Sequence, residues 1–411
     1  MPELFHVLTV AQANDRLSAH IVPLGRTEPV PVLDALDRVT ATDLRAAVDL
    51  PAFARSTMDG FAVRAADTYG ASEGLPACLT ISGEVAMGRA ATIEVAAGAA
   101  ARIHTGGMLP AGADAVVMVE NTQQIDEHML EVVRAVAVGE NVIPIGDDVR
   151  MGDLLFAQGH WLRPQDLGGL AGVGITTVPV SVRPRVAILA TGDEVVPADR
   201  AVAPGQIRDI NSYTIAALTR RAGGEPVLYG IAPDQAAPFR EMARTALAES
   251  DALIISAGSS VSTRDMTAQV IGELGQPGVL VHGVSIHPGK PTILAVAGAK
   301  PVFGLPGNPV STMVAYELFV TPTLLRMLGC ARPQAWRTVQ ARLAHNVASH
   351  PGREDFVPVR VVSRDDGLLW AEPVFGKSNL IYTMARADGM LPVPLDRAGL
   401  YAGDLVTVRL F

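Results

Sequence analysis

The stretch RVAILATGDE, residues 185–194, predicts the fold of the central part of the chain. Its unbroken apolar run is typical of a strand buried on both faces, and the polar end is typical of the loop that follows such a strand. Segments with helical spacing, such as Ile215, Leu218 and Ala222, separate it from further apolar runs. This alternation predicts an α/β fold for residues 183–330, with a doubly wound, mainly parallel sheet. The further runs lie at residues 226–234, 252–258, 279–286 and 301–307.

The chain on either side of this segment has a different character. A capping-box pair, Thr9 and Gln12, predicts a helix near the start. Short Val- and Ile-rich runs between Gly and Pro residues then predict a mostly β domain, and Gly-rich sequence connects it to the α/β domain. Short alternating strands at the end predict a small β-barrel or sandwich. The divisions that we expect are residues 1–48, 49–147, 148–182, 183–330 and 331–411.

The composition limits the class of protein. The chain has 411 residues, of which 49% are hydrophobic and 18% charged, so it is suited to about two to four folded domains rather than to disorder. A net charge of −9 without a basic run argues against general nucleic-acid binding. Cys78 and Cys330 are too few and too far apart for a disulfide framework. Without a leader peptide or an apolar stretch of about 18 residues, we expect a soluble cytoplasmic protein.

Polar loops follow the strands of the α/β domain and should meet at one edge of its sheet. Ligands of open α/β sheets bind beyond the carboxyl ends of the strands, where glycine N–H groups can approach an oxyanion. Glu194, Asp234 and Asp265 are suited to Mg²⁺ together with substrate phosphates. With the glycines, hydroxyls and Lys290 of the same loops, they predict a site for a phosphate-bearing small molecule and a metal ion. The loops span residues 191–194, 233–234, 256–265, 287–291 and 304–309.

Each of these features also has a simpler explanation. A carboxylate after a strand often caps a helix, and a Gly-Ser loop is often only a turn. Taken by itself, Met58-Asp59-Gly60 favours a tight turn between apolar runs. The sequence contains no P-loop, no dinucleotide GxGxxG, no GxSxG elbow and no cluster of histidine ligands. The occurrence of five polar loops on one edge is what favours a ligand site.

Long motifs spread over nearly the whole chain resemble those of molybdopterin molybdenumtransferase, the family of MoeA and the gephyrin E domain. Their order is the same as in that family, which makes the resemblance specific. The motifs are PAFARSTMDGFAVR (51–64), RIHTGGMLPAGADAVVMVE (102–120), NVIPIGDDVRMGD (141–153), ILATGDEVV (188–196), GQIRDINSY (205–213), PGKPT (288–292), VFGLPGNPVS (302–311) and GLYAGDLVTVRLF (399–411).

The resemblance implies an activity and an architecture. Members insert molybdate into adenylylated molybdopterin, release AMP and form molybdenum cofactor, with Mg²⁺ required. The family plan implies a linker region built from residues 1–48 and 148–182, a lid over 49–147, a molybdopterin-binding domain and a C-terminal barrel. It also implies a homodimer whose site is shared between subunits, and a molybdopterin adenylyltransferase as a possible partner. No nucleic acid and no membrane is expected as a partner.

The resemblance also assigns roles to individual residues. The lid would contribute Asp59 and Thr105, which close over the ligand, and three acids of the α/β domain would hold Mg²⁺ on the pyrophosphate. A group with Lys290 and Arg353 would receive molybdate, a divalent oxyanion that needs fixed donors and positive charge. The assigned residues are Asp59, Thr105, Glu194, Asp234 and Asp265 for catalysis, and Asp148, Gly258, Ser259, Lys290, Pro306, Pro309, Ser311, Arg353 and Ser378 for substrate binding.

Four positions depart from the family pattern. Ala257 and Ser262 stand where glycines are usual, so the backbone there must adopt ordinary dihedral angles. His287 stands where a lysine is frequent, which weakens the positive charge near pH 7, and Asn379 replaces a glycine. Two rival functions remain at this point: a non-catalytic scaffold of the gephyrin type, and a molybdopterin adenylyltransferase, whose fold the α/β domain resembles.

Overall fold

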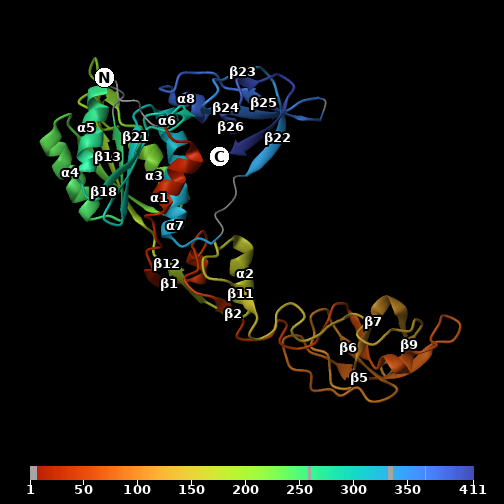
Figure 1. The fold of residues 1–411 in the computed structure, drawn as a ribbon. Coiled ribbons are helices and arrows are strands. Elements are labelled where there is room, and N and C mark those ends of the chain that lie inside the picture. The colour runs from red at the N-terminus through yellow and green to blue at the C-terminus, as the bar shows by residue number, and fades with distance from the viewer. Residues whose placement is uncertain (1–6, 258–260, 332–336, 366) are drawn as a thin grey trace.

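The computed structural model describes residues 7–257, 261–331, 337–365 and 367–411. The chain is elongated, and Figure 1 shows its three regions. The α/β domain and the C-terminal β domain lie side by side at one end, a small linker region occupies the middle, and the lid lies at the other end. Of the residues described, none forms a helix long and apolar enough to cross a membrane.

The α/β domain contains a mixed six-stranded sheet with helices on both faces, which confirms the predicted fold class. The sheet order is β16-β13-β17-β21-β20-β18, and the first four of these strands are parallel. One apolar core lies on the side of α3 and α6, and the other on the side of α4 and α5. The strands are β13 (Arg185–Thr191), β16 (Glu225–Ala232), β17 (Ala252–Ala257), β18 (Pro277–His282), β20 (Ile293–Ala297) and β21 (Lys300–Pro306). The helices are α3 (Asn211–Arg221), α4 (Ala236–Ala248), α5 (Val261–Gly272), α6 (Pro309–Ala315) and α7 (Thr321–Met327), with a π-helical turn, η4 (Tyr316–Val320), between the last two.

Two details of this sheet differ from the sequence prediction. The expected single strand at residues 279–286 is divided, because Gly283 has φ +97° and ends β18. Its second part, β19 (Ile286–His287), pairs with β24 (Glu354–Ser363) of the C-terminal domain. The strand β20 was not expected, and it runs antiparallel to both of its neighbours because a tight turn at Gly298 folds it against β21.

The N-terminal helix α1 (Val10–Ser18) begins as predicted. Thr9 accepts a hydrogen bond from the Gln12 N–H, and the Gln12 side chain accepts one from the Thr9 N–H, so the capping box is confirmed. The buried face of the helix, Ala13 and Leu17, joins the core on the α3 side of the α/β sheet. The helix therefore packs on the α/β domain, although the prediction placed it in the linker region.

The linker region is built from two distant chain segments. The pairs β1–β12 and β2–β11 are both antiparallel and bring residues 27–45 beside residues 154–181. Val30, Leu162, Leu170 and Val178 are buried in its small core. The elements are β1 (Thr27–Pro31), η1 (Val32–Asp34), β2 (Leu44–Arg45), β11 (Leu154–Phe156), α2 (Pro164–Gly172) and β12 (Thr177–Ser181).

The lid is a six-stranded sheet with the order β7-β4-β6-β5-β9-β8, in which only β5 and β6 are paired in parallel. Gly60 opens β4 where the sheet is tightest, because a Cβ there would lie 2.0 Å from the Val117 carbonyl oxygen. The strands are β4 (Gly60–Val63), β5 (Ala77–Glu84), β6 (Ala99–Ile103), β7 (Ala115–Met118), β8 (Thr122–Gln124) and β9 (Met129–Val132). Smaller elements are β3 (Arg55–Ser56), η2 (Ala65–Thr68), η3 (Val119–Asn121) and β10 (Val142–Ile143).

The C-terminal domain is a closed five-stranded barrel, as predicted. The order β24-β25-β22-β28-β26 is closed by a second pairing between β24 and β26, and β19 of the α/β domain adds to the outside of β24. The barrel strands are β22 (Thr338–Leu343), β24, β25 (Leu369–Pro373), β26 (Gly389–Val393) and β28 (Leu405–Leu410). The remaining elements are β23 (Val347–Ala348), α8 (Ile381–Ala385) and β27 (Gly399–Leu400).

A buried carboxylate fixes the start of α2 in the linker region. The side chain of Asp166 is only 3% exposed, and it accepts hydrogen bonds from Arg163 at 2.9 and 3.0 Å and forms one with His160 at 2.7 Å. Burial by itself raises the pKa of Asp166, but Arg163 and His160 outweigh it and lower the pKa to about 2. Since this lies below the unfolded value of about 3.9, the carboxylate stabilises the fold above pH 4, and the contribution is lost as the pH falls toward 2.

Replacing Asp166 by asparagine should therefore lower the local free energy of unfolding by about 2 kcal/mol at pH 7, and the difference should shrink below pH 4. Hydrogen–deuterium exchange of peptides that cover α2 measures it. Asp34→Asn, a change of an exposed acid in the same region, is the matched control and should stay within about 0.5 kcal/mol of the parent protein. Equal exchange in both variants would contradict the assigned role.

Candidate functional site

The loops after β13 and β16 are joined at the carboxyl edge of the α/β sheet. The Asp234 N–H donates to Asp193 Oδ1 at 3.0 Å. Gly192 has φ +133°, and the space that a Cβ would take there is 2.7 Å from Glu194 Oε2. The turn therefore requires glycine, and the Glu194 carboxylate folds back over it. The predicted neighbourhood of the Glu194 and Asp234 loops is thus present.

The predicted magnesium ligands are only partly brought together. Glu194 and Asp265 are exposed, Asp234 is half-buried, and Asp265 lies in the first turns of α5. Within the described residues, no three His, Cys, Asp or Glu side chains form a group that could hold a metal. Because Mg²⁺ usually takes only one or two carboxylates together with substrate phosphates and water, two neighbouring acidic loops fit that ion in ligand type. The role of these three acids as metal ligands stays a prediction.

The PGKP turn meets the barrel through strand pairing. In the β19–β24 ladder His287 lies opposite Asp355, and the Glu354 N–H donates to the Ser285 carbonyl at 2.9 Å. This pairing places the exposed Lys290 and its turn beside the start of β24, where Arg353 lies. His287 of the α/β domain and Arg353 of the barrel, which both lie against Asp355, therefore share one region, and Lys290 follows His287 in the same turn.

The start of α6 meets a second loop of the barrel. The Asn308 amide donates to Ser378 Oγ at 3.1 Å, and the Val310 N–H donates to the Ser378 carbonyl at 3.1 Å. Asn308 directly precedes the helix, but its side chain bonds Ser378 rather than a helix N–H. A Cβ on Gly289 would lie 3.6 Å from the Ser311 carbonyl oxygen, so the PGKP turn also packs on this helix. Pro306 ends β21, and Pro309 opens α6.

The charges around this region are already organised. Arg353 contacts Asp355 twice, at 2.8 Å from Nε and 3.2 Å from Nη2, and the Asp355 side chain is only 5% exposed. His287 Nδ1 lies 3.8 Å from the same carboxylate. Partial burial lowers the pKa of His287, and Arg353 and His350 lower it further, although Asp355 acts in the opposite direction. The histidine therefore adds little positive charge at pH 7, whereas Arg353 is held in a fixed orientation.

The lid presents its own polar group. Asp59 Oδ1 accepts hydrogen bonds from the Thr105 N–H at 2.7 Å and from the Thr105 hydroxyl at 3.0 Å. These bonds lower the pKa of Asp59, the backbone bond having the larger effect, and His104 lowers it further. The structure thus brings Asp59 and Thr105 together, 46 residues apart in sequence. Met58 and Asp59 also form the predicted turn, between β3 and β4.

Three family models match the chain in consecutive stretches. The MoeA N-terminal region (domain I and II) matches residues 8–174, a probable molybdopterin binding domain matches residues 187–326, and the MoeA C-terminal region (domain IV) matches residues 340–411. The chain belongs to the MoeA family. The resemblance stated from the sequence motifs is confirmed.

Relatives match almost from end to end. A putative molybdopterin biosynthesis protein of Methanocaldococcus jannaschii is 36% identical, over 96% of this chain and 95% of its own. The molybdopterin molybdenumtransferase of Bacillus subtilis is 33% identical, over 96% and 92% of the two chains. A solved structure of a molybdopterin biosynthesis MoeA protein from Pyrococcus horikoshii has a TM-score of 0.85 at 32% identity and covers 98% of this chain and 100% of that one. This MoeA-family chain is thus a transferase of molybdenum cofactor biosynthesis.

Other predicted site residues of this MoeA-family protein lie elsewhere or are not described. Asp148 is exposed where the lid joins the linker region, and its N–H donates to the Leu50 carbonyl at 3.0 Å. It is therefore not part of the α/β edge. Gly258 and Ser259 lie outside the described residues. Of the departures from the family pattern, Ala257 is buried at the end of β17 and Asn379 is exposed beside Ser378.

Sequence reasoning missed Asn211, the first residue of α3. Its side-chain amide donates to Ser256 Oγ and to the Gly307 carbonyl, both at 2.8 Å. One residue therefore ties α3 to the end of β17 and to the loop that follows β21. The GQIRDINSY motif contains Asn211 and so pointed to this residue, but it gave no indication of the contacts with Ser256 and Gly307.

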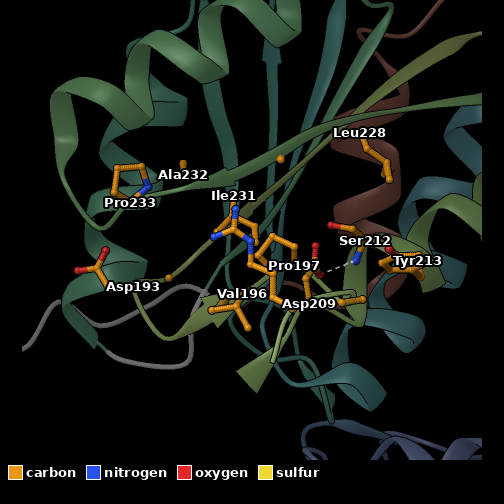
Figure 2. A pocket seen from close by; sticks show the side chains of 15 residues that line it. Asp193, Val196, Pro197, Asp209, Ser212, Tyr213, Leu228, Ile231, Ala232 and Pro233 are labelled. Atoms are coloured by element: carbon orange, nitrogen blue, oxygen red, sulfur yellow. Dashed lines mark hydrogen bonds between the residues drawn. The ribbon is translucent and has the colours of Figure 1, made fainter. Parts of the chain in front are cut away.

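A cavity of about 530 Å³ beside the edge was also missed. It lies between β16 and a two-stranded ribbon, β14 (Val195–Val196) and β15 (Ile207–Arg208). Figure 2 shows Asp193 and Pro233 at one end and Ser212 and Tyr213 at the other, where the Ser212 N–H donates a hydrogen bond to Asp209. The cavity extends the acidic edge toward α3.

Replacing Thr105 by valine should raise the pKa of Asp59 toward its ordinary value, because valine cannot donate to Oδ1 while the backbone bond remains. A carboxyl-carbon NMR titration of protein with labelled aspartate measures the shift. Thr122→Val is the matched control, since it removes a lid hydroxyl that donates to the Val119 carbonyl instead. If Asp59 titrates identically in the parent protein and in Thr105→Val, the hydroxyl has no part in holding the carboxylate.

Proposed function

We propose that this protein inserts molybdate into the dithiolene of adenylylated molybdopterin in the cytoplasm, releasing AMP and forming the molybdenum cofactor. Membership of the MoeA family supports the reaction class. The observation that supports the proposal is that two segments of the barrel join the α/β domain here, one through the β19–β24 ladder and the other through the bond from Asn308 to Ser378. A molybdopterin adenylyltransferase is the expected source of the substrate.

The group around α6 supplies what a divalent oxyanion needs. Lys290 is an exposed cation on a turn, and Arg353 offers a planar guanidinium held by Asp355. Ser311 and Ser378 add hydroxyl groups that can donate hydrogen bonds. Donors fixed before the ligand arrives need no reorganisation when it binds, which favours molybdate at this place.

The acidic loops at the carboxyl edge of the α/β sheet are suited to the pyrophosphate that links AMP to molybdopterin in the substrate. Glu194, Asp234 and Asp265 would hold Mg²⁺ against the pyrophosphate, and the bound cation would offset the charge that develops as the phosphoanhydride breaks. The hydrogen bond from the Asp234 N–H to Asp193 holds two of these loops in register. The protein's own contribution is to orient the pyrophosphate between these loops and the α6 region.

The lid would complete the site from a second subunit. In a single chain the lid and the α/β domain lie at opposite ends of an elongated molecule (Figure 1). Asp59, which precedes β4 of the lid, is therefore remote from the α/β sheet of the same chain. A homodimer in which each lid closes over the partner's α/β domain would bring Asp59 and Thr105 to the ligand and exclude water. The dimer is part of the proposal.

The deciding assay supplies adenylylated molybdopterin and Mg²⁺ with either molybdate or tungstate and measures AMP release and cofactor formation. Turnover with an oxyanion is the expected result. Net formation of adenylylated molybdopterin from molybdopterin and ATP without molybdate would instead identify an adenylyltransferase. Binding of adenylylated molybdopterin without any turnover would favour the scaffold function. Comparing the turnover rates with molybdate and with tungstate gives the metal preference.

Replacing Asp265 by alanine should reduce AMP release by at least about tenfold at limiting Mg²⁺, because one of the expected ligands is lost. Raising the Mg²⁺ concentration should restore part of the rate. Glu241→Ala, an exposed acid on α4, is the matched control and should leave the rate unchanged. Unchanged AMP release in Asp265→Ala would remove Asp265 from the metal-binding set.

A further inference from the structure

A histidine in the lid bridges two carboxylates. His104 Nε2 lies 3.0 Å from Glu84 Oε1, and His104 Nδ1 lies 3.8 Å from Asp59 Oδ1. The same Asp59 oxygen accepts both hydrogen bonds from Thr105. Glu84, His104, Asp59 and Thr105 thus form one connected group, which we call the lid cluster.

Sheet register assembles the lid cluster from three separate segments. Glu84 ends β5, which pairs in parallel with β6 so that Glu84 lies beside Arg102. His104 follows β6 directly, and Gly60 of β4 pairs with Ile103, which places Asp59 next to His104. The cluster is therefore a consequence of strand pairing in the lid and does not require contact with another domain.

The chemistry of imidazole couples this arrangement to protonation. Both partners of the ring are carboxylates, which only accept hydrogen bonds when ionised. A neutral imidazole has one N–H and can donate to one of them, whereas the protonated ring can donate to both. The contact with Glu84 at 3.0 Å sets the ring orientation, so Nδ1 faces Asp59.

We propose that His104 is a positioning residue for the reaction: it holds the Asp59 carboxylate and supplies a pH-dependent positive charge to the face of the lid that closes over the oxyanion. The inference rests on the proposed function, since it assigns Asp59 to the closed site. His104 acts through Asp59 and need not touch the substrate itself.

The expected consequence is a pH-dependent KM for molybdate. Asp59, from the β3–β4 loop, and Glu84, from β5, are the charged groups within ion-pair distance of His104 among the residues described. Arg102, on β6, donates to Gln124 at 2.5 Å. When His104 is neutral, the lid cluster carries the two negative charges of Asp59 and Glu84 toward a divalent anion. When the ring is protonated, its positive charge offsets one of these two negative charges. The KM should therefore be lower at pH 6 than at pH 8.

The test measures kcat and KM for molybdate from pH 6 to pH 8 in the full-length protein. His104→Gln should raise the KM at pH 6 by about twofold to fivefold, the effect of one exposed charge pair, and abolish its pH dependence. His104→Lys should keep the low KM and extend it to pH 8, because lysine stays charged. His128→Gln, an exposed lid histidine before β9, is the matched control and should reproduce the parent profile.

The outcomes separate this inference from the proposed function. If the parent protein converts adenylylated molybdopterin and His104→Gln keeps the parent pH profile, the positioning role of His104 is wrong while the function stands. If His104→Gln and His104→Lys both give the same pH-independent KM for molybdate, the charge of residue 104 has no effect and its side chain serves only to pack the lid. Failure of the parent protein to turn over would defeat the function itself, and NMR titration of Asp59 in His104→Gln would still show whether the ring acts on that carboxylate.

Discussion

The site depends on the short ladder between β19 and β24. Two residue pairs of this ladder, Ile286 with Glu354 and His287 with Asp355, join the α/β domain to the barrel. Their register brings the Lys290 turn and Arg353 into one region, and the contact of Ser378 with Asn308 closes the same region from the other side. The pairing thus holds together two domains that each contribute donors suited to an oxyanion.

The β19–β24 pairing also affects how charged side chains are distributed along the carboxyl edge of the α/β sheet. Arg353 is oriented by a buried Asp355, because a charge that leaves water needs a partner. The acidic loops that contain Glu194 and Asp234 lie at the ends of other strands, so cationic donors and carboxylates occupy different parts of one edge. A chain with a net charge of −9 therefore still has cationic side chains gathered in one part of its surface.

The lid supplies polar groups that are complete before closure. Thr105 and His104 hold Asp59 within the lid itself, through bonds that the register of β4, β5 and β6 creates. Since these contacts do not involve the α/β domain, closure can bring a preformed group to the ligand. In the elongated chain the lid lies at the end opposite the α/β domain (Figure 1), which is why the proposed function places each lid over a second subunit.

The sequence by itself determined the elements and the fold class, because these depend on local periodicity. The capping box at Thr9 and the buried strand at residues 185–191 are each set by neighbouring residues. Long motifs also identified the family and marked Asp59 and Thr105. Only the tertiary structure decided that β19 leaves its own sheet, that β20 runs antiparallel and that Asn211 joins two distant loops. These features, like the bridge from Glu84 through His104 to Asp59, are made by pairings between residues far apart in the chain, which no local pattern encodes.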